Sequence, residues 1–116
     1  TLGPLSAYRD FVDVRDVAGA VLAAAFARID DPVINVGSGR ARQVRDVVRL
    51  IADAAGFGGS VHELPVPSGR SAGVDWIQAD ISRAQRVLGW QPWTDLRETL
   101  EAVWLHAISH PGLVTS

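Results

Sequence analysis

The side chains that could do chemistry in this 116-residue sequence form a short set, because two residue types are absent. There is no Cys, which excludes disulfides, thiolate metal sites and cysteine nucleophiles. There is also no Lys, so all eleven basic residues are Arg, and Schiff-base chemistry, P-loop nucleotide binding and a Tyr-Lys pair are excluded from this chain. Arginines, histidines, carboxylates and one glycine turn remain as candidates.

The glycine turn is Gly37-Ser38-Gly39, which follows an apolar run at 33–36 and precedes a helical pattern. This order is typical of a dinucleotide-binding turn. However, Arg42 stands where the third glycine of the G-x-G-x-x-G motif would be. We interpret the segment as a structural turn and expect no cofactor site in this chain.

His106 and His110 are four residues apart on a predicted helix, the spacing of two zinc ligands. Ala107 replaces the glutamate of that motif, and the sequence offers no third ligand, so we expect no metal site. Histidines in a last helical turn also stabilise the helix dipole without any ligand. The arginines are interspersed with thirteen acidic residues at a net charge of −2, which argues against nucleic acid as a partner.

The composition suits one globular domain, with 47% hydrophobic and 21% charged residues. The longest apolar stretch, 17–27, is shorter than the roughly 20 residues of a membrane span, so we expect no membrane association. The sequence begins at Thr1 without the pattern of a signal peptide. We therefore expect a soluble, cytoplasmic piece of a longer protein.

The elements that must position the candidates alternate between strands and helices. Strands are predicted at 9–14 and 33–36, a further strand at 61–64 and an extended segment at 74–79. Four helical patterns are predicted, at 14–29, 44–55, 81–88 and 95–110. The first places Val14, Val17, Ala18, Val21, Ala24 and Ala25 on one helical stripe. This order predicts an α/β or α+β domain.

Several side chains are predicted to be structural. Asp13 with Asp16 has the spacing of a capping box, and Asp80 and Asp95 each precede an apolar helical pattern, which favours caps over catalytic acids. Gly56 and Gly89 should end their helices in the left-handed conformation. Asp30-Asp31-Pro32 should end the first helix, and Trp90 with Trp104 should anchor the last one.

Four segments in this order resemble the C-terminal part of extended short-chain dehydrogenase/reductases that act on nucleotide sugars. They are Arg9-Asp10-Phe11-Val12-Asp13-Val14-Arg15-Asp16-Val17-Ala18, Ile34-Asn35-Val36-Gly37-Ser38-Gly39, Asp80-Ile81-Ser82-Arg83-Ala84 and Leu88-Gly89-Trp90-Gln91-Pro92. The resemblance covers nearly the whole chain. The first segment, together with Arg45-Asp46-Val47-Val48, looks most like the GDP-4-keto-6-deoxymannose reductases.

The resemblance implies a Rossmann-type fold whose N-terminal half, with the NAD or NADP turn and the Tyr-xxx-Lys pair, lies outside this sequence. Tyr8 is the only tyrosine, and Val12 stands where the lysine would be. The resemblance thus implies that residues 1–116 are a single substrate-binding portion, with no catalytic residue and no bound cofactor. It further implies that residues 1–36 pack on the cofactor half, and that without this half the chain self-associates.

The partner implied by the resemblance is a nucleoside-diphosphate sugar. Arg9 matches the family's diphosphate arginine, with a salt bridge to Asp10 or a neighbouring carboxylate as the structural alternative. Arg70 lies ten residues before Asp80, where the family has a second diphosphate arginine, but it is followed by Ser71-Ala72-Gly73 instead of the usual Pro-x-Asp. Planar guanidinium groups can bind diphosphate oxygens in a bidentate manner.

Asn35 and Ser38 are further pocket candidates, with backbone hydrogen bonding as their alternative role. The resemblance favours a 4-ketoreductase and leaves an epimerase or a dehydratase open. The alternative from another class is a stand-alone, non-catalytic module that binds nucleotides or mediates assembly.

Overall fold

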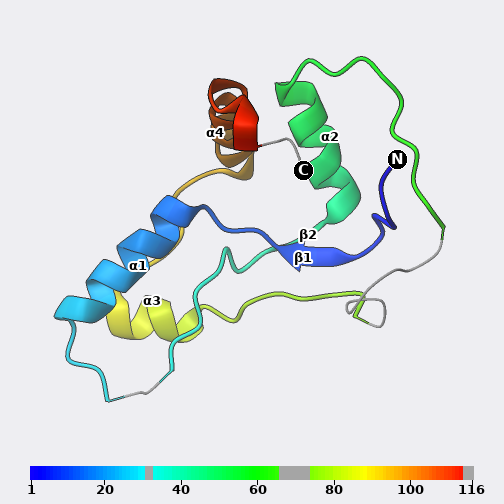
Figure 1. Cartoon of the computed structure of the whole chain (residues 1–116). Coiled ribbons are helices and arrows are strands. Elements are labelled where there is room, and N and C mark those ends of the chain that lie inside the picture. The colour runs from blue at the N-terminus through cyan, green and yellow to red at the C-terminus, as the bar shows by residue number, and fades with distance from the viewer. Residues whose placement is uncertain (31–32, 66–73, 114–116) are drawn as a thin grey trace.

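The computed structural model describes residues 1–30, 33–65 and 74–113, and these residues form two pairs of helices on either side of a small sheet (Figure 1). In one pair α1 (Val14–Phe26) packs against α3 (Ser82–Leu88). In the other pair α2 (Val44–Ala54) packs against α4 (Leu96–Ser109). A 3₁₀ turn, η1 (Pro111–Leu113), follows α4. The expected α/β class is confirmed.

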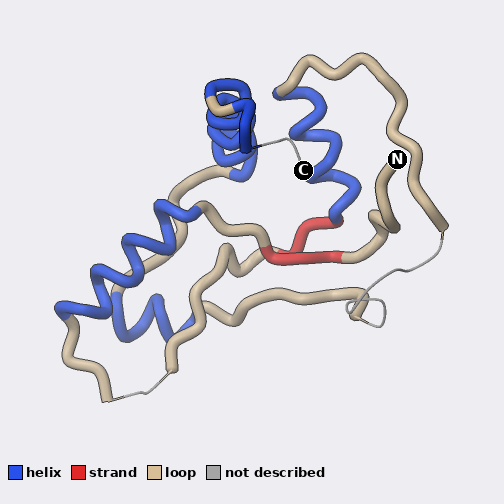
Figure 2. The backbone as a smooth tube through the Cα atoms, in the orientation of Figure 1, coloured by secondary structure: helices blue, strands red, loops and turns tan. Residues whose placement is uncertain are grey.

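The sheet joins β1 (Tyr8–Asp10) to β2 (Ala41–Gln43) in antiparallel register, with Arg9 opposite Arg42. A third segment lies along β1: the amide of Tyr8 donates to the carbonyl of Asp75 at 2.8 Å, and the amide of Ile77 donates to the carbonyl of Tyr8 at 3.1 Å. The expected extended conformation of 74–79 is thereby confirmed. Loops connect most of these elements (Figure 2).

The buried core between α1 and α3 consists of Ala20, Ala84 and Trp90. Trp90 Nε1 donates to the carbonyl of Asp16 at 2.9 Å, so this tryptophan anchors α1. The expectation that Trp90 anchors the last helix is therefore wrong. Trp90 reaches α1 because Gly89 before it has a left-handed φ of +61°, which turns the chain after α3 back toward α1.

Two strand predictions are wrong within the described residues. Residues 33–36 form no strand, although Ile34 and Val36 pack against the core. Residues 61–64 contribute only a single bridge, between Glu63 and Leu2. A strand exists only through hydrogen bonds to a neighbour, and for 33–36 the described chain supplies none.

The apolar stripe of α1 lies mostly outside the core of the described chain. The helix buries Asp16 and Ala20, while Val14 and Val21 of the stripe are 77% and 64% exposed. The helix ends at Phe26, earlier than expected, and Asp31 and Pro32 lie outside the described residues. The face of α1 that carries Asp16 and Ala20 points inward because the Asp16 carboxylate is hydrogen-bonded there, as described below.

The other helix ends agree closely with the sequence. Gly56 and Gly89 are left-handed at φ +63° and +61° after α2 and α3. Asp95 occupies the N-cap position of α4, although its side chain makes no capping bond. Asp80 accepts a hydrogen bond from the amide of Ser82 at 3.0 Å, while the N-cap position of α3 falls on Ile81.

The chain exposes far more surface than a compact domain of its size. Its accessible surface is 8274 Å², against about 6100 Å² for a folded monomer of this mass. Its radius of gyration is 16.6 Å, against about 13 Å for a compact domain of this length. The two helix pairs of Figure 1 therefore share little common core.

Candidate functional site

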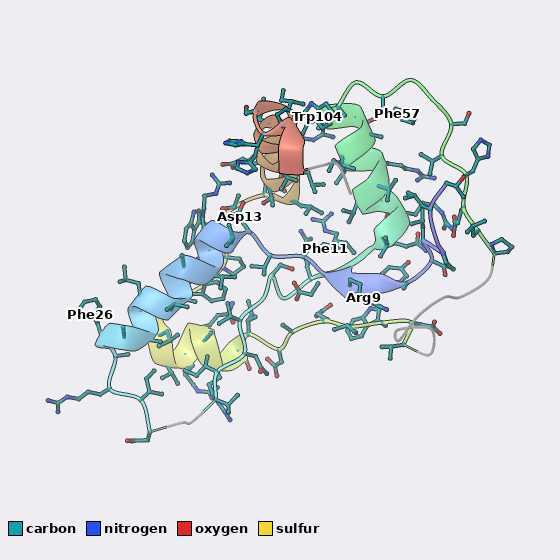
Figure 3. The ribbon with its side chains drawn as sticks, in the orientation of Figure 1. Arg9, Phe11, Asp13, Phe26, Phe57 and Trp104 are labelled. Atoms are coloured by element: carbon teal, nitrogen blue, oxygen red, sulfur yellow. The ribbon has the colours of Figure 1, made fainter. Side chains whose placement is uncertain are left out.

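Arg9 lies on β1, and its guanidinium group is directed at the segment that follows residue 73 (Figure 3). Nη1 donates to the carbonyl of Tyr8 at 2.7 Å, and Nη2 donates to the carbonyl of Val74 at 2.8 Å. Of the five N–H donors of a guanidinium group, these two bonds leave three for a ligand. The alternative of an ion pair with Asp10 is not what the described residues form.

Arg70 lies outside the described residues, so its side chain is not located. The chain that follows it is located. Val74, only four residues later, is hydrogen-bonded to Arg9, and the backbone of Asp75 and Ile77 bonds to Tyr8. The structure thus brings β1 and the segment after residue 73 together, although 65 positions separate Arg9 from Val74 in the sequence.

Ser38 is tied to a carboxylate of β1. Its hydroxyl donates to Asp10 Oδ1 at 2.6 Å, and the same oxygen accepts the Ser38 amide at 2.7 Å. Asp10 Oδ2 accepts the amides of Gly39 at 3.0 Å and Ala79 at 3.1 Å. Asn35 is exposed and lines a hollow of about 460 Å³ together with Asp10 and Ile77.

These contacts test whether the glycine turn could hold a dinucleotide cofactor, and it does not fit one. A phosphate-binding turn needs free backbone amides at the start of a helix. Here the amides of Ser38 and Gly39 already donate to the Asp10 carboxylate, which would repel a phosphate. The turn also leads into β2 before α2 begins.

Asp13 caps α1 and links it to α4. Its Oδ1 accepts the amide of Arg15 at 2.8 Å, its carboxylate pairs with the Arg15 guanidinium at 2.8 Å, and Oδ2 accepts the Thr99 hydroxyl at 2.8 Å. The hydrogen bonds from the Arg15 side chain hold the pKa of the Asp13 carboxyl well below its usual range. The same pairing raises the pKa of Arg15.

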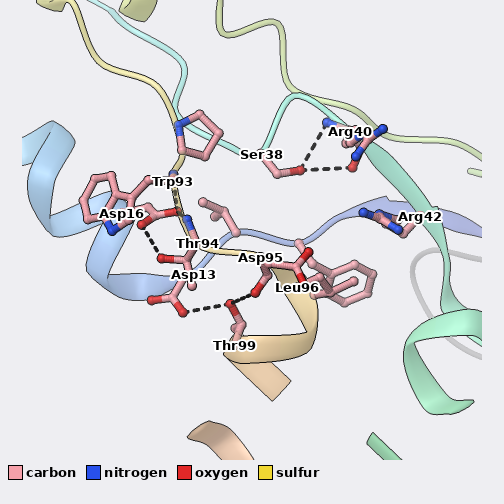
Figure 4. Close-up of a pocket in the computed structure, with 13 residues that line it drawn as sticks. Asp13, Asp16, Ser38, Arg40, Arg42, Trp93, Thr94, Asp95, Leu96 and Thr99 are labelled. Atoms are coloured by element: carbon pink, nitrogen blue, oxygen red, sulfur yellow. Dashed lines mark hydrogen bonds between the residues drawn. The ribbon is translucent and has the colours of Figure 1, made fainter. Parts of the chain in front are cut away.

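Asp16, only 1% exposed, serves the loop between α3 and α4 and not the predicted capping box. Its Oδ2 accepts the amides of Trp93 and Thr94 at 3.1 and 3.0 Å, and its Oδ1 accepts the Thr94 hydroxyl at 2.7 Å (Figure 4). The expected box with Asp13 is wrong because these distant donors occupy the carboxylate.

A pocket of about 240 Å³ lies between α1, the start of α4 and β2 (Figure 4). Arg40 and Arg42 line it, and among the described residues their guanidinium groups form no hydrogen bond or ion pair. Sequence reasoning missed them, although the Arg-x-Arg spacing that follows a glycine turn was visible. Ser38 lies at the pocket edge, beside Arg40.

The two histidines stack on each other, with ring centroids 4.3 Å apart, and His110 Nδ1 lies 3.1 Å from the carbonyl of His106. Within residues 1–30, 33–65 and 74–113, no group of three or more His, Asp or Glu side chains could hold a metal ion. No helix of the described chain is long and apolar enough to cross a membrane.

Sequence comparison finds relatives among nucleotide-sugar enzymes, while no family model matches the chain. The dTDP-6-deoxy-L-talose 4-dehydrogenase (NAD(P)(+)) of Kitasatospora kifunensis is 41% identical over 104 residues, which are 90% of this chain and 33% of that protein. The GDP-6-deoxy-D-mannose reductase of Pseudomonas aeruginosa is 28% identical over 102 residues, 88% of this chain and 33% of that protein.

Among solved structures, the UDP-glucose 4-epimerase of Thermotoga maritima, crystallised with UDP-glucose, superposes with a TM-score of 0.83 at 27% identity. The match covers 96% of this chain and 35% of the epimerase. The chain therefore spans about a third of the length of the proteins that it matches. These findings confirm the resemblance drawn from the four sequence segments.

Proposed function

Since the chain is homologous to nucleotide-sugar epimerases and reductases of the extended short-chain dehydrogenase/reductase type, we propose that it is the substrate-binding portion of such an enzyme. Its ligand is a nucleoside-diphosphate sugar, and the enzyme oxidises or reduces the sugar at C4. The 41% identity to a 4-dehydrogenase of a dTDP-linked 6-deoxy sugar supports the oxidoreductase over the epimerase.

The observation that carries this proposal is the position of Arg9. Its guanidinium group is held by two carbonyls, keeps three N–H donors and lies against the segment that continues from Arg70. Arg9, with Arg70 as the second arginine of the proposed site, would grip one diphosphate, whose negative charge favours bidentate guanidinium contacts.

Hydride transfer requires NAD(P), together with a Tyr-xxx-Lys pair that this sequence lacks, because it contains no Lys and Val12 stands four residues after Tyr8, its single tyrosine. We assign those groups to the remaining part of the enzyme. Purified alone, residues 1–116 should therefore turn over no nucleotide sugar with either nicotinamide cofactor. Turnover above background by the chain alone would contradict the assignment, and the full-length enzyme is the positive control.

The exposed face of α1 supports a docking role for residues 1–36. Val14, Val21, Leu22 and Phe26 of α1 and Val33 after it are each more than 60% exposed. We assign this face, and the excess of roughly 2000 Å² of surface, to contact with the cofactor-binding half. A stable interface buries about 800 Å² on each partner, so this excess exceeds what one such contact needs.

The arginines test the site directly. In the full-length enzyme, Arg9→Ala and Arg70→Ala should each weaken binding of the nucleoside diphosphate by about 1.5–3 kcal/mol. Titration calorimetry with GDP, UDP and dTDP measures this effect and identifies the preferred base. NAD(P) binding should stay unchanged, and Arg9→Lys should restore little because an ammonium group lacks the planar fork.

Arg49→Ala is the matched control, because Arg49 lies exposed on α2 and pairs only with Asp46 among the described residues. It should bind all three diphosphates like the wild type. Wild-type affinity in both Arg9→Ala and Arg70→Ala would refute the site. It would leave the second candidate, a non-catalytic assembly module, as the better reading of the exposed α1 face.

A further inference from the structure

Both carboxylate oxygens of Asp10 are occupied by donors from other segments of the described chain. Its two oxygens accept four hydrogen bonds, from the amide and hydroxyl of Ser38 and from the amides of Gly39 and Ala79, all between 2.6 and 3.1 Å. A carboxylate offers about four lone-pair sites. Asp10 is therefore saturated within the chain and cannot itself bind a ligand.

The donors come from two segments that are far apart in sequence and are pressed together behind the carboxylate. A Cβ on Gly37 would lie 2.6 Å from the Cβ of Ala79 and 3.1 Å from Asp10 Oδ2. No side chain larger than a hydrogen fits there without a shift. Asp10 thus fastens the glycine turn and Ala79 to the end of β1 at one tightly packed point.

The segment 74–79 is attached to β1 at two places. Near its start, the backbone of Asp75 and Ile77 bonds to Tyr8, and Arg9 bonds to the carbonyl of Val74. At its end, the amide of Ala79 bonds to Asp10. The Asp10 bond fixes how far the segment can slide along β1, and hence where the Val74 carbonyl that holds Arg9 lies.

We propose that Asp10 is a positioning residue for nucleotide-sugar binding: its carboxylate locks segment 74–79 against β1, so that the carbonyl of Val74 holds the Arg9 guanidinium in place for the diphosphate. This inference rests on the proposed function and adds to it a residue that does not touch the ligand. Asp10 acts through Arg9, its neighbour on β1, and through Val74, the hydrogen-bond partner of Arg9 on segment 74–79.

Asparagine is the sharpest replacement because it keeps the size of the side chain. An amide group has one acceptor oxygen, and its NH₂ would face two of the four donors. Asp10→Asn therefore loses the contacts on one side, either those to Ser38 or those to Gly39 and Ala79. Asp16→Asn is the matched control, because Asp16 accepts three hydrogen bonds from Trp93 and Thr94 and none from Arg9 or segment 74–79.

The experiment compares both variants in the full-length enzyme, at a temperature where circular dichroism shows both folded. For Asp10→Asn we expect the Kd of dTDP, UDP or GDP, whichever binds best, and the KM of the nucleotide sugar to rise about tenfold, with kcat within about twofold. Asp16→Asn should lower Tm comparably while its Kd stays within twofold. A Kd within twofold of wild type in Asp10→Asn, or an equal rise in Asp16→Asn, would overturn the proposal.

Two further measurements keep the outcome decisive. If Asp10→Asn does not fold, Ser38→Ala removes a single bond to the carboxylate, and it should raise the Kd by about threefold; an unchanged Kd rejects the proposal. If the wild type binds no nucleoside diphosphate, the proposed function fails. Hydrogen exchange then tests the positioning role. Asp10→Asn must speed amide exchange in 74–79 but not in α1. Equal exchange rates in wild type and Asp10→Asn reject the positioning role.

Discussion

The two sides of α1 differ in whether their side chains find partners within the chain. On the inner side, the carboxylates of Asp10, Asp13 and Asp16, spaced three residues apart at and before the helix, are all hydrogen-bonded to distant parts of the chain. On the outer side, Leu22 and Phe26 are 62% and 85% exposed. The carboxylates of the inner side thus have all their hydrogen-bond donors within the chain, whereas the apolar side chains of the outer side remain in contact with solvent.

The difference shows which interactions the chain can satisfy alone. A carboxylate needs only a few donors at the right distance, and loops after α3 and around Gly39 supply them. An apolar helix face needs a matching surface, at roughly 25 cal/mol for each Å² removed from water. Within the described residues, α3 covers only the side of α1 that carries Ala20.

The largest expected effect is at Asp16. Asp16→Ala leaves the amides of Trp93 and Thr94 and the Thr94 hydroxyl without their buried acceptor. Unsatisfied buried donors cost about 1–3 kcal/mol each, so we expect a loss of about 3–5 kcal/mol in the free energy of unfolding. Urea denaturation measures it, with exposed Asp46→Ala as the control. A loss below about 1 kcal/mol would mean that these carboxylate contacts do not hold the fold.

The second-largest loss of stability is expected from a steric change at Gly37, beside the Asp10 carboxylate. Gly37→Ala puts a methyl group 2.6 Å from the Cβ of Ala79, while Gly58→Ala meets no atom within 4 Å. We expect Gly37→Ala to lower the free energy of unfolding by about 1–3 kcal/mol, and Gly58→Ala to change it by less than about 0.5 kcal/mol. Thermal denaturation of the two variants side by side checks this, and equal stability would contradict the close packing at Gly37.

Acid should weaken the carboxylate contacts of the inner side, because these contacts require ionised side chains. The lowered pKa of Asp13 means that the unfolded state binds its proton first, so the stability that Asp13 contributes is present above pH 4 and is lost as the pH falls from there through its folded-state pKa. One such group contributes at most about 1.4 kcal/mol per pH unit.

The measurement is Tm as a function of pH for the wild type and Asp13→Asn. The variant should show a flatter loss below pH 4. Some slope should remain, because the amide of Leu5 lowers the pKa of Glu63 and the side chain of Ser82 lowers that of Asp80. Identical slopes in the two proteins would show that the Arg15 contact does not stabilise the Asp13 carboxylate.

A change on the exposed apolar face of α1 should have the smallest effect on stability and the largest effect on self-association of the chain. Phe26→Ser should change the free energy of unfolding by less than about 0.5 kcal/mol, because the ring is solvated. The same change should reduce self-association of residues 1–116, which the exposed apolar face promotes. Sedimentation velocity over a concentration series tests both. A wild-type chain that stays monomeric at high concentration would contradict the docking role of this face.

Local patterns in the sequence determined where the helices lie and where α2, α3 and α4 end. The glycines at 56 and 89 end α2 and α3 because only a residue without a Cβ adopts a left-handed φ at little cost. Apolar spacing located α2 and α4, and Asp95 marked the start of α4. The four family segments also pointed to nucleotide-sugar enzymes without any structural information, because their order and spacing are specific in combination.

Only the tertiary structure decided which face of α1 is buried, and it chose the carboxylates over the aliphatic stripe. The sequence could not show that Asp16 meets Trp93 and Thr94, nearly 80 positions away, because such a contact depends on how α3 and its glycine return the chain. The contact between Arg9 and Val74 was hidden for the same reason. Periodicity predicts that a residue lies on a face, whereas the donors, acceptors and surfaces that meet that face are set by the path of the whole chain.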